Sequence, residues 1–146
     1  MPLLGSLGAA SAKGYGLTSA AAPGTPTGVT ATDVGTGRAY NNGAATVAFT
    51  PNGAEATSFT ATSSPGGYTA TGASSPLTVT GLQSGVSYTF TVTATNAIGT
   101  SDASAASAAM TATTIPQAPT IGTATGGNAS ATVAYTANAT GGKAVS

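Results

Sequence analysis

The hydrophobic pattern of this chain consists of short alternating runs separated by turn residues. The clearest run covers residues 88–95, where Tyr, Phe, Val and Ala alternate strictly with four threonines. A period of two places alternate side chains on opposite faces of a strand. Antiparallel sheets allow one such face to meet a core and the other to meet water. Threonine suits the wet face because its branched side chain favours strands, so the run predicts a half-buried antiparallel strand.

Six further runs of this kind, bounded by Gly, Pro, Asn and Ser, lie on either side of it. The predicted strands cover residues 28–32, 45–50, 58–62, 68–71, 77–80 and 88–95, with a last one that includes Met110 and ends near Ile115. Seven short strands in about 90 residues predict an all-β sandwich. The Ala-rich stretch 103–109 makes one helical turn or leads into the last strand, and we favour the second interpretation.

The side chains available for the core of this sandwich are few. The predicted core consists of Val29, Val47, Phe49, Phe59, Leu77, Val79, Leu82, Tyr88, Phe90, Val92 and Met110, with Ala31, Ala61 and Ala94 as spacers. Burying each large side chain contributes about 1.5–3 kcal/mol, whereas ordering the backbone costs about 1–2 kcal/mol per residue. We therefore expect modest stability, which neighbouring modules or assembly partners raise.

Residues 1–22 form a separate segment that is rich in Gly, Ala and Ser and ends where Pro23 and Pro26 mark a boundary. Its large apolar residues are Leu3, Leu4, Leu7, Tyr15 and Leu17. The segment is either a disordered leader, as chain ends often are, or an arm that orders when it docks onto another protein. The clustering of apolar residues favours the docking arm, so these five residues are the candidate docking site.

The chain also repeats itself after the predicted sandwich. Residues 118–125 resemble residues 25–32, and residues 131–136 match residues 45–50 almost residue for residue. We therefore expect a docking arm at 1–22, a sandwich at 23–114 and the first strands of a second, incomplete copy at 115–146. Two strands alone are not independently stable, so the chain continues past Ser146 or the strands pair with another chain. We expect continuation, because arrays are built from whole repeats.

The charged residues and the absence of reactive side chains argue against several classes of function. The three basic residues Lys13, Arg38 and Lys143 balance the three acidic residues Asp33, Glu55 and Asp102. Three isolated cations cannot supply binding to nucleic acid or to a membrane surface. The chain has no His and no Cys, which removes the usual nucleophile–base pairs and zinc ligands. We expect no enzyme activity, no cofactor and no metal, since a calcium site at Asp33 or Asp102 would have one carboxylate.

Three tyrosines, Tyr15, Tyr40 and Tyr68, lie outside the predicted core. Such side chains can bind a sugar by stacking, and Tyr40 stands beside Asn41 and Asn42 in a long loop. Alternatively, each ring covers an edge or end of the sandwich, which is the usual role of scattered surface aromatics. We favour the covering role.

The most specific segment covers residues 81–96, with the sequence GLQSGVSYTFTVTATN. It resembles fibronectin type III domains, and the resemblance covers residues 24–114 fully and 115–146 in part. It implies an immunoglobulin-like, seven-stranded β-sandwich, here with an extended N-terminal arm. It also implies that Leu82 and Tyr88 form a tyrosine corner, in which the hydroxyl ties back to the preceding turn. The family usually has a Trp in its second strand, where this chain has Val47 and Phe49, so we expect lighter packing.

The Thr-, Ala- and Gly-rich, Cys-free composition, with a repeat behind a short leader, resembles phage tail-fibre and other virion-appendage proteins. The resemblance implies a virion structural protein that is part of an oligomeric assembly. Residues 1–22 would anchor it to other virion or surface structural proteins, and the sandwich would project as a spacer or a weak adhesin for host-surface carbohydrate. The alternative is a spacer or carbohydrate-adhesive module of a bacterial secreted or cell-surface protein.

Overall fold

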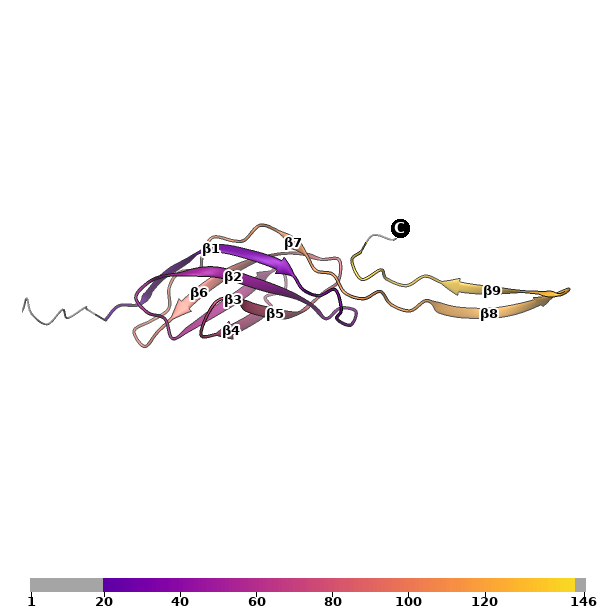
Figure 1. The fold of residues 1–146 in the computed structure, drawn as a ribbon, viewed down its shortest axis with the longest axis horizontal. Helices are drawn as coiled ribbons and strands as arrows, with labels where there is room; N and C mark the ends of the chain where they lie inside the picture. The colour runs from indigo at the N-terminus through magenta and orange to yellow at the C-terminus, as the bar shows by residue number, and fades with distance from the viewer. Residues whose placement is uncertain (1–19, 144–146) are drawn as a thin grey trace, which may run out of the picture.

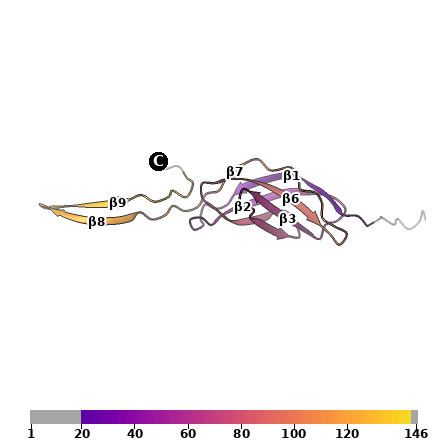
Figure 2. The ribbon, with the colours of Figure 1, turned by 180° about the vertical axis from the view of Figure 1, so that it is seen from behind.

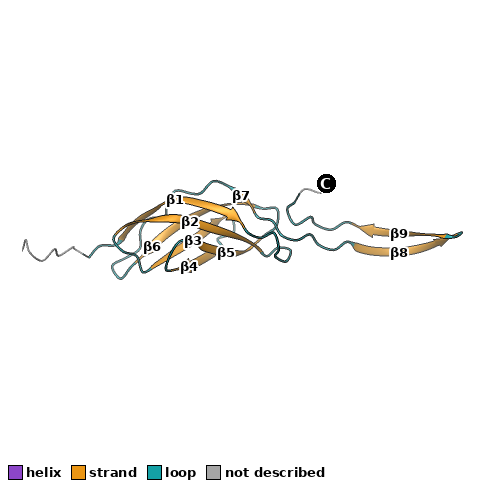
Figure 3. Ribbon diagram, viewed as in Figure 1, coloured by secondary structure: helices purple, strands orange, loops and turns teal. Residues whose placement is uncertain are grey.

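The computed structural model describes residues 20–143, and within that range every regular element is a β-strand (Figure 1, Figure 3). The strands are β1 (Pro23–Asp33), β2 (Gly43–Gly53), β3 (Ser58–Ser64), β4 (Thr69–Gly72), β5 (Leu77–Leu82), β6 (Ser87–Thr95), β7 (Met110–Thr111), β8 (Thr120–Gly127) and β9 (Ser130–Thr136). The predicted docking residues Leu3, Leu4, Leu7, Tyr15 and Leu17 lie outside the described residues, so their role stays a prediction.

The first seven strands form two antiparallel sheets that pack face to face. One sheet has the order β1-β2-β5 and the other the order β4-β3-β6-β7. This arrangement confirms the predicted all-β, immunoglobulin-like sandwich. Residues near Pro23 and the β2–β3 loop form its N-terminal end, and the end of β1 and the β5–β6 turn form its C-terminal end (Figure 1).

Period-two patterning places the core where the sequence predicts it. Tyr88, Phe90, Val92 and Ala94 of β6 are all buried, and the threonines between them are partly exposed. Phe49 and Phe59 meet across the two sheets with ring centroids 4.9 Å apart. Val29 and Met110 are only partly buried, because β1 and β7 lie at sheet edges.

Several buried or partly buried residues were absent from the predicted core, among them Ala45, Ala112 and Tyr68. Ala45 and Ala112 are fully buried, but alanine carries little hydrophobic signal in a chain so rich in it. Tyr68 packs against the core with its ring 6.0 Å from that of Tyr88, in an edge-to-face arrangement. Tyr68 is thus partly buried at the margin of the core rather than within it, which agrees with the covering role favoured for it.

The segment between β6 and β7 contains a serine at every third position. Ser101, Ser104 and Ser107 pair in turn with Ala94, Val92 and Phe90 of β6. Each serine donates its backbone amide to the opposite carbonyl at 2.8–2.9 Å. Its hydroxyl oxygen accepts the amide of the same β6 residue at 2.9–3.1 Å. This serine ladder completes the pairing of β6, so the last strand is much shorter than predicted and the stretch forms no helical turn.

Strands β8 and β9 form a separate two-stranded hairpin that projects beyond the C-terminal end of the sandwich (Figure 1, and from behind in Figure 2). Its register reproduces that of the hairpin formed by β1 and β2. Ala124 lies opposite Val133, as Ala31 lies opposite Val47. The internal repeat in the sequence is therefore also a repeat of strand pairing.

The two hairpins differ in what covers them. Val47 and Phe49 are 0% and 7% exposed, whereas the matching Val133 and Tyr135 are 52% and 71% exposed. Ile121 on β8 is 74% exposed. Within residues 20–143, β8 and β9 pair only with each other, so the second hairpin has neither a third strand nor a facing sheet.

Candidate functional site

The chain leaves β7 and returns after β9 to the same C-terminal end of the sandwich. Thr114 donates its amide to the carbonyl of Gly141 at 2.8 Å, and Gln117 donates to Ala139 at 2.9 Å. The segment between the sandwich and the hairpin is thus paired along one side with the segment that follows β9. This paired segment is an ordered junction between the sandwich and the hairpin, and it is the candidate functional site.

Two glycines make the closest contact in this junction. A Cβ on Gly142 would lie 2.5 Å from the Gly85 nitrogen and 2.8 Å from the Ala112 carbonyl oxygen. A Cβ on Gly141 would meet the carbonyl oxygens of Thr114 and Ile115. Both glycines also have positive φ, at 70° and 80°, where other residues are strained. The returning turn therefore fits the sandwich only because it has no side chains.

The sandwich side of this contact is held by a local hydrogen-bond network. Asn41 donates its amide to the Ser84 hydroxyl at 3.0 Å, and Ser84 donates its amide to the Asn41 side chain at 3.1 Å. The hydroxyls of Ser84 and Thr114 lie 2.5 Å apart. These bonds join the β1–β2 loop, the β5–β6 turn and the junction to one another beside the glycine turn.

Asp33 is part of the same network. Its carboxylate accepts the amides of Gly35 at 3.1 Å and Thr113 at 3.2 Å, and it also accepts the Thr113 hydroxyl. The Asp33 carboxylate is thus engaged by donors of the protein itself, because β1 ends beside the departing chain. The Arg38 guanidinium donates hydrogen bonds to Asn42 within the same loop. The backbone carbonyl of Arg38 accepts a hydrogen bond from the Ile115 amide at 3.0 Å.

At the opposite end, Asn96 fixes the incoming chain. Its side-chain amide donates to the carbonyls of Ala21 at 2.8 Å and Glu55 at 3.1 Å. Its side-chain oxygen accepts the amides of Ile98 and Gly99 at 2.9 and 3.2 Å. One residue thus joins the start of the sandwich, the β2–β3 loop and the turn after β6.

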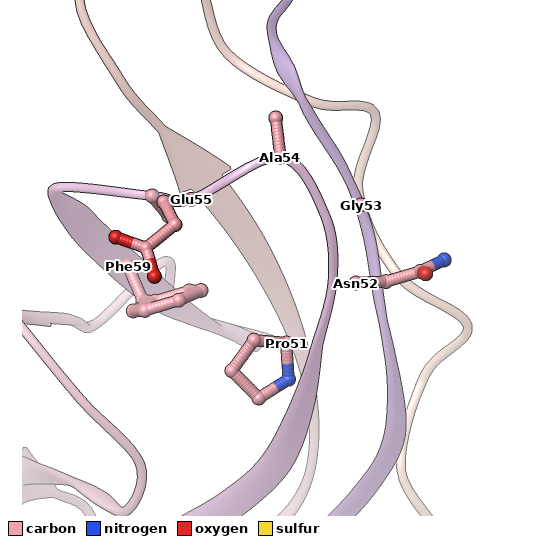
Figure 4. A pocket seen from close by; sticks show the side chains of 7 residues that line it. Pro51, Asn52, Gly53, Ala54, Glu55 and Phe59 are labelled. Carbon is pink, nitrogen blue, oxygen red and sulfur yellow. The ribbon is translucent and has the colours of Figure 1, made fainter. Parts of the chain in front are cut away.

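A hollow of about 410 Å³ lies beside this loop. Figure 4 shows the Glu55 carboxylate extending over the Phe59 ring, with Pro51 below. Glu55 is the one ionisable residue among those lining the hollow. Phe59 is only 4% exposed, so its ring does not present a face on which a sugar could stack. The hollow offers neither a catalytic pair nor an aromatic platform.

Leu82 and Tyr88 are the residues of the predicted tyrosine corner. The hydroxyl oxygen of Tyr88 accepts a hydrogen bond from the backbone amide of Gln83, with a nitrogen–oxygen distance of 3.0 Å. Leu82, the neighbour of Gln83, is fully buried. Tyr40 is half-buried in the β1–β2 loop, and Tyr15 lies outside the described residues. Among residues 20–143, no three Asp or Glu side chains gather as a metal site would require. In the same range there is no helix of a length and hydropathy suited to crossing a bilayer.

The two facing sheets, with the tyrosine of β6 tied to the preceding turn, place the fold in the immunoglobulin-like class. Residues 24–110 match the fibronectin type III domain family. The chain belongs to that family, whose members are modules of the spacer and adhesion type. No curated protein matches the chain.

Solved structures with this fold include two that illustrate the similarity. "Titin kinase and its flanking domains" is 23% identical with a TM-score of 0.50, and the match covers 62% of this chain and 17% of that one. The FN1–FN3 domains of chicken CNTN1 are 20% identical with a TM-score of 0.51, and the match covers 68% of this chain and 35% of that one. These structures therefore support the architecture of the sandwich and no particular ligand.

Proposed function

We propose that this chain is a non-enzymatic spacer in an elongate virion appendage, such as a tail fibre. The observation that carries the proposal is the path of the chain, which begins the sandwich at one end and leaves it at the other (Figure 1). A module with this path adds its full length to an array. The Thr-, Ala- and Gly-rich composition supports the virion setting, with residues 1–22 as the anchor to other particle proteins.

The hairpin of β8 and β9 supports a tandem arrangement. Its register equals that of the first hairpin, and its exposed Val133 and Tyr135 stand where the first sandwich has core residues. An exposed apolar sheet face is a surface that another layer covers in a stable sandwich. In the proposed array, β8 and β9 are the first strands of a second module of the same kind.

The structure favours a spacer role over an enzymatic role and over a sugar-binding role. Asp33 is engaged by the junction, and Glu55 borders a hollow without an ionisable partner among the lining residues. Tyr68, one of the candidate sugar-stacking residues, packs edge-to-face on Tyr88. Binding of host carbohydrate would then be a weak, secondary property of the appendage.

Immunoelectron microscopy tests the virion setting. Antibodies raised against the folded sandwich should label a projecting appendage of particles from the source, and removal of residues 1–22 should abolish incorporation. Circular dichroism of the shortened chain is the control, because it should retain the strand spectrum of the intact chain. Labelling of a bacterial surface without labelling of particles would replace the virion setting with the bacterial spacer.

A further inference from the structure

We infer that the C-terminal end of the sandwich is a docking surface for a Gly-Gly turn of the module that follows, and that this contact fixes the angle between modules. The docking surface consists of Ser84, Gly85, Ala112, Thr114 and Ile115. Its occupant in this chain is the turn at Gly141 and Gly142. The inference goes beyond the spacer function and applies equally in a virion or a bacterial appendage.

The contact is made by backbone atoms at both sides. Gly142 has no side chain, and the Gly85 nitrogen lies 2.5 Å from the position that a Cβ on Gly142 would take. Gly85 itself is held by donating its amide to Ala112 at 2.8 Å. Backbone groups that are already bonded cannot rotate away as long side chains do. The fit therefore resists bending more than a side-chain contact of the same size.

The segment between β7 and β8, here called the linker, is held at two further points. The bonds from Thr114 to Gly141 and from Gln117 to Ala139 lie on either side of Pro116, whose ring restricts its own φ. Because these two bonds are separated along the linker, the hairpin cannot pivot about either one of them. The hairpin therefore keeps one orientation relative to the sandwich.

The docking surface is also selective. In the internal repeat Thr136 corresponds to Thr50, so Gly141 and Gly142, five and six residues later, correspond to Glu55 and Ala56 of the first sandwich. Both residues carry a Cβ, which this kind of surface does not admit. The loop of the first sandwich therefore does not fit the surface that receives the second. A follower is recognised by adjacent glycines in its second loop.

Pulsed electron–electron double resonance, which measures the distance between two spin labels, tests the fixed angle. The chain has no Cys, so Thr80→Cys on β5 and Thr132→Cys on β9, both exposed positions, give two unique spin-label sites. We expect one narrow distance distribution in this labelled chain. Gly142→Ala should broaden it several-fold, whereas the control Gly126→Ala should not, because a Cβ there would meet nothing within 4 Å.

The paired change Gly141→Glu with Gly142→Ala tests the selectivity, because it installs the residues of the first loop. It should broaden the distribution at least as much as Gly142→Ala alone. Amide exchange of Gln117 in the unsubstituted chain is an independent measure, expected to be at least tenfold slower than that of exposed loop amides. A broad distribution in the labelled parent, a narrow one in either glycine variant, or unprotected exchange at Gln117 would overturn the inference.

Discussion

Gln83 donates its backbone amide to the hydroxyl of Tyr88 at 3.0 Å, which ties the β5–β6 turn to the middle of the core. Tyr88 is only 2% exposed, so the turn and the core share one polar contact. Because Ser84 and Gly85 follow Gln83 directly, this contact also positions the surface that receives the glycine turn. The tyrosine corner therefore acts on both the stability of the sandwich and the geometry of the junction.

Tyr88→Phe should lower the free energy of unfolding by about 1–3 kcal/mol, because it leaves the part-buried Gln83 amide without its acceptor. Urea denaturation followed by circular dichroism measures the change. Tyr135→Phe is the matched control, since Tyr135 is 71% exposed on the hairpin. Equal stability of the two variants would contradict the role given to the hydroxyl.

Stability should also fall at alkaline pH through Tyr88. Burial raises the pKa of Tyr88 above its ordinary value of 10.0, although the Gln83 bond opposes the shift. Above pH 10 the unfolded chain loses this proton while the folded chain keeps it, so the contribution is complete below that pH and declines as pH rises through the folded pKa. Urea titrations between pH 7 and 12 should show a smaller decline for Tyr88→Phe than for the parent chain.

Ser104→Ala should destabilise the sandwich by about 1–3 kcal/mol, because the buried Val92 amide loses its hydroxyl acceptor. Ser74→Ala, at an exposed position in the β4–β5 turn, is the control and should change little. Thermal unfolding compares the two. If both variants melt with the parent, the serine ladder adds no stability.

Phe49→Ala and Tyr135→Ala test the difference between the two hairpins at matching positions. Phe49 is buried against Phe59, so its loss should cost about 3–5 kcal/mol. Tyr135 is exposed, and its loss should change the unfolding of the sandwich by less than about 0.5 kcal/mol. Chemical denaturation followed by tyrosine fluorescence or circular dichroism gives both values, and similar costs would contradict the exposed state of the second hairpin.

The parts of the fold that follow a period of two could be predicted from the sequence. Residues 88–95 place their apolar side chains in the core as expected, and Val47 and Phe49 do the same on β2. Val29 and Met110 were harder to place, because an alternating pattern does not reveal which strands lie at the edges of a sheet.

Other features carry no such pattern. The serines of the ladder recur every three residues, which matches neither a strand nor a helix, and they work only because β6 lies beside them. Gly85 and Gly142 are far apart in the sequence, and their contact depends on how the chain returns from the hairpin to the sandwich. The sequence predicts a turn at each of these glycines. It does not predict that the two turns contact each other, because that contact appears only when the backbone is folded.

The serine ladder and β1 both run from the N-terminal to the C-terminal end of the sandwich. When the two ends are pulled apart, the load acts along these segments, and their bonds to β6 and β2 are strained in shear. Bonds loaded in this way share the force and break together, whereas bonds that are peeled break in sequence. Tension along the long axis of the sandwich would thus be shared among many backbone bonds, even though the core is small.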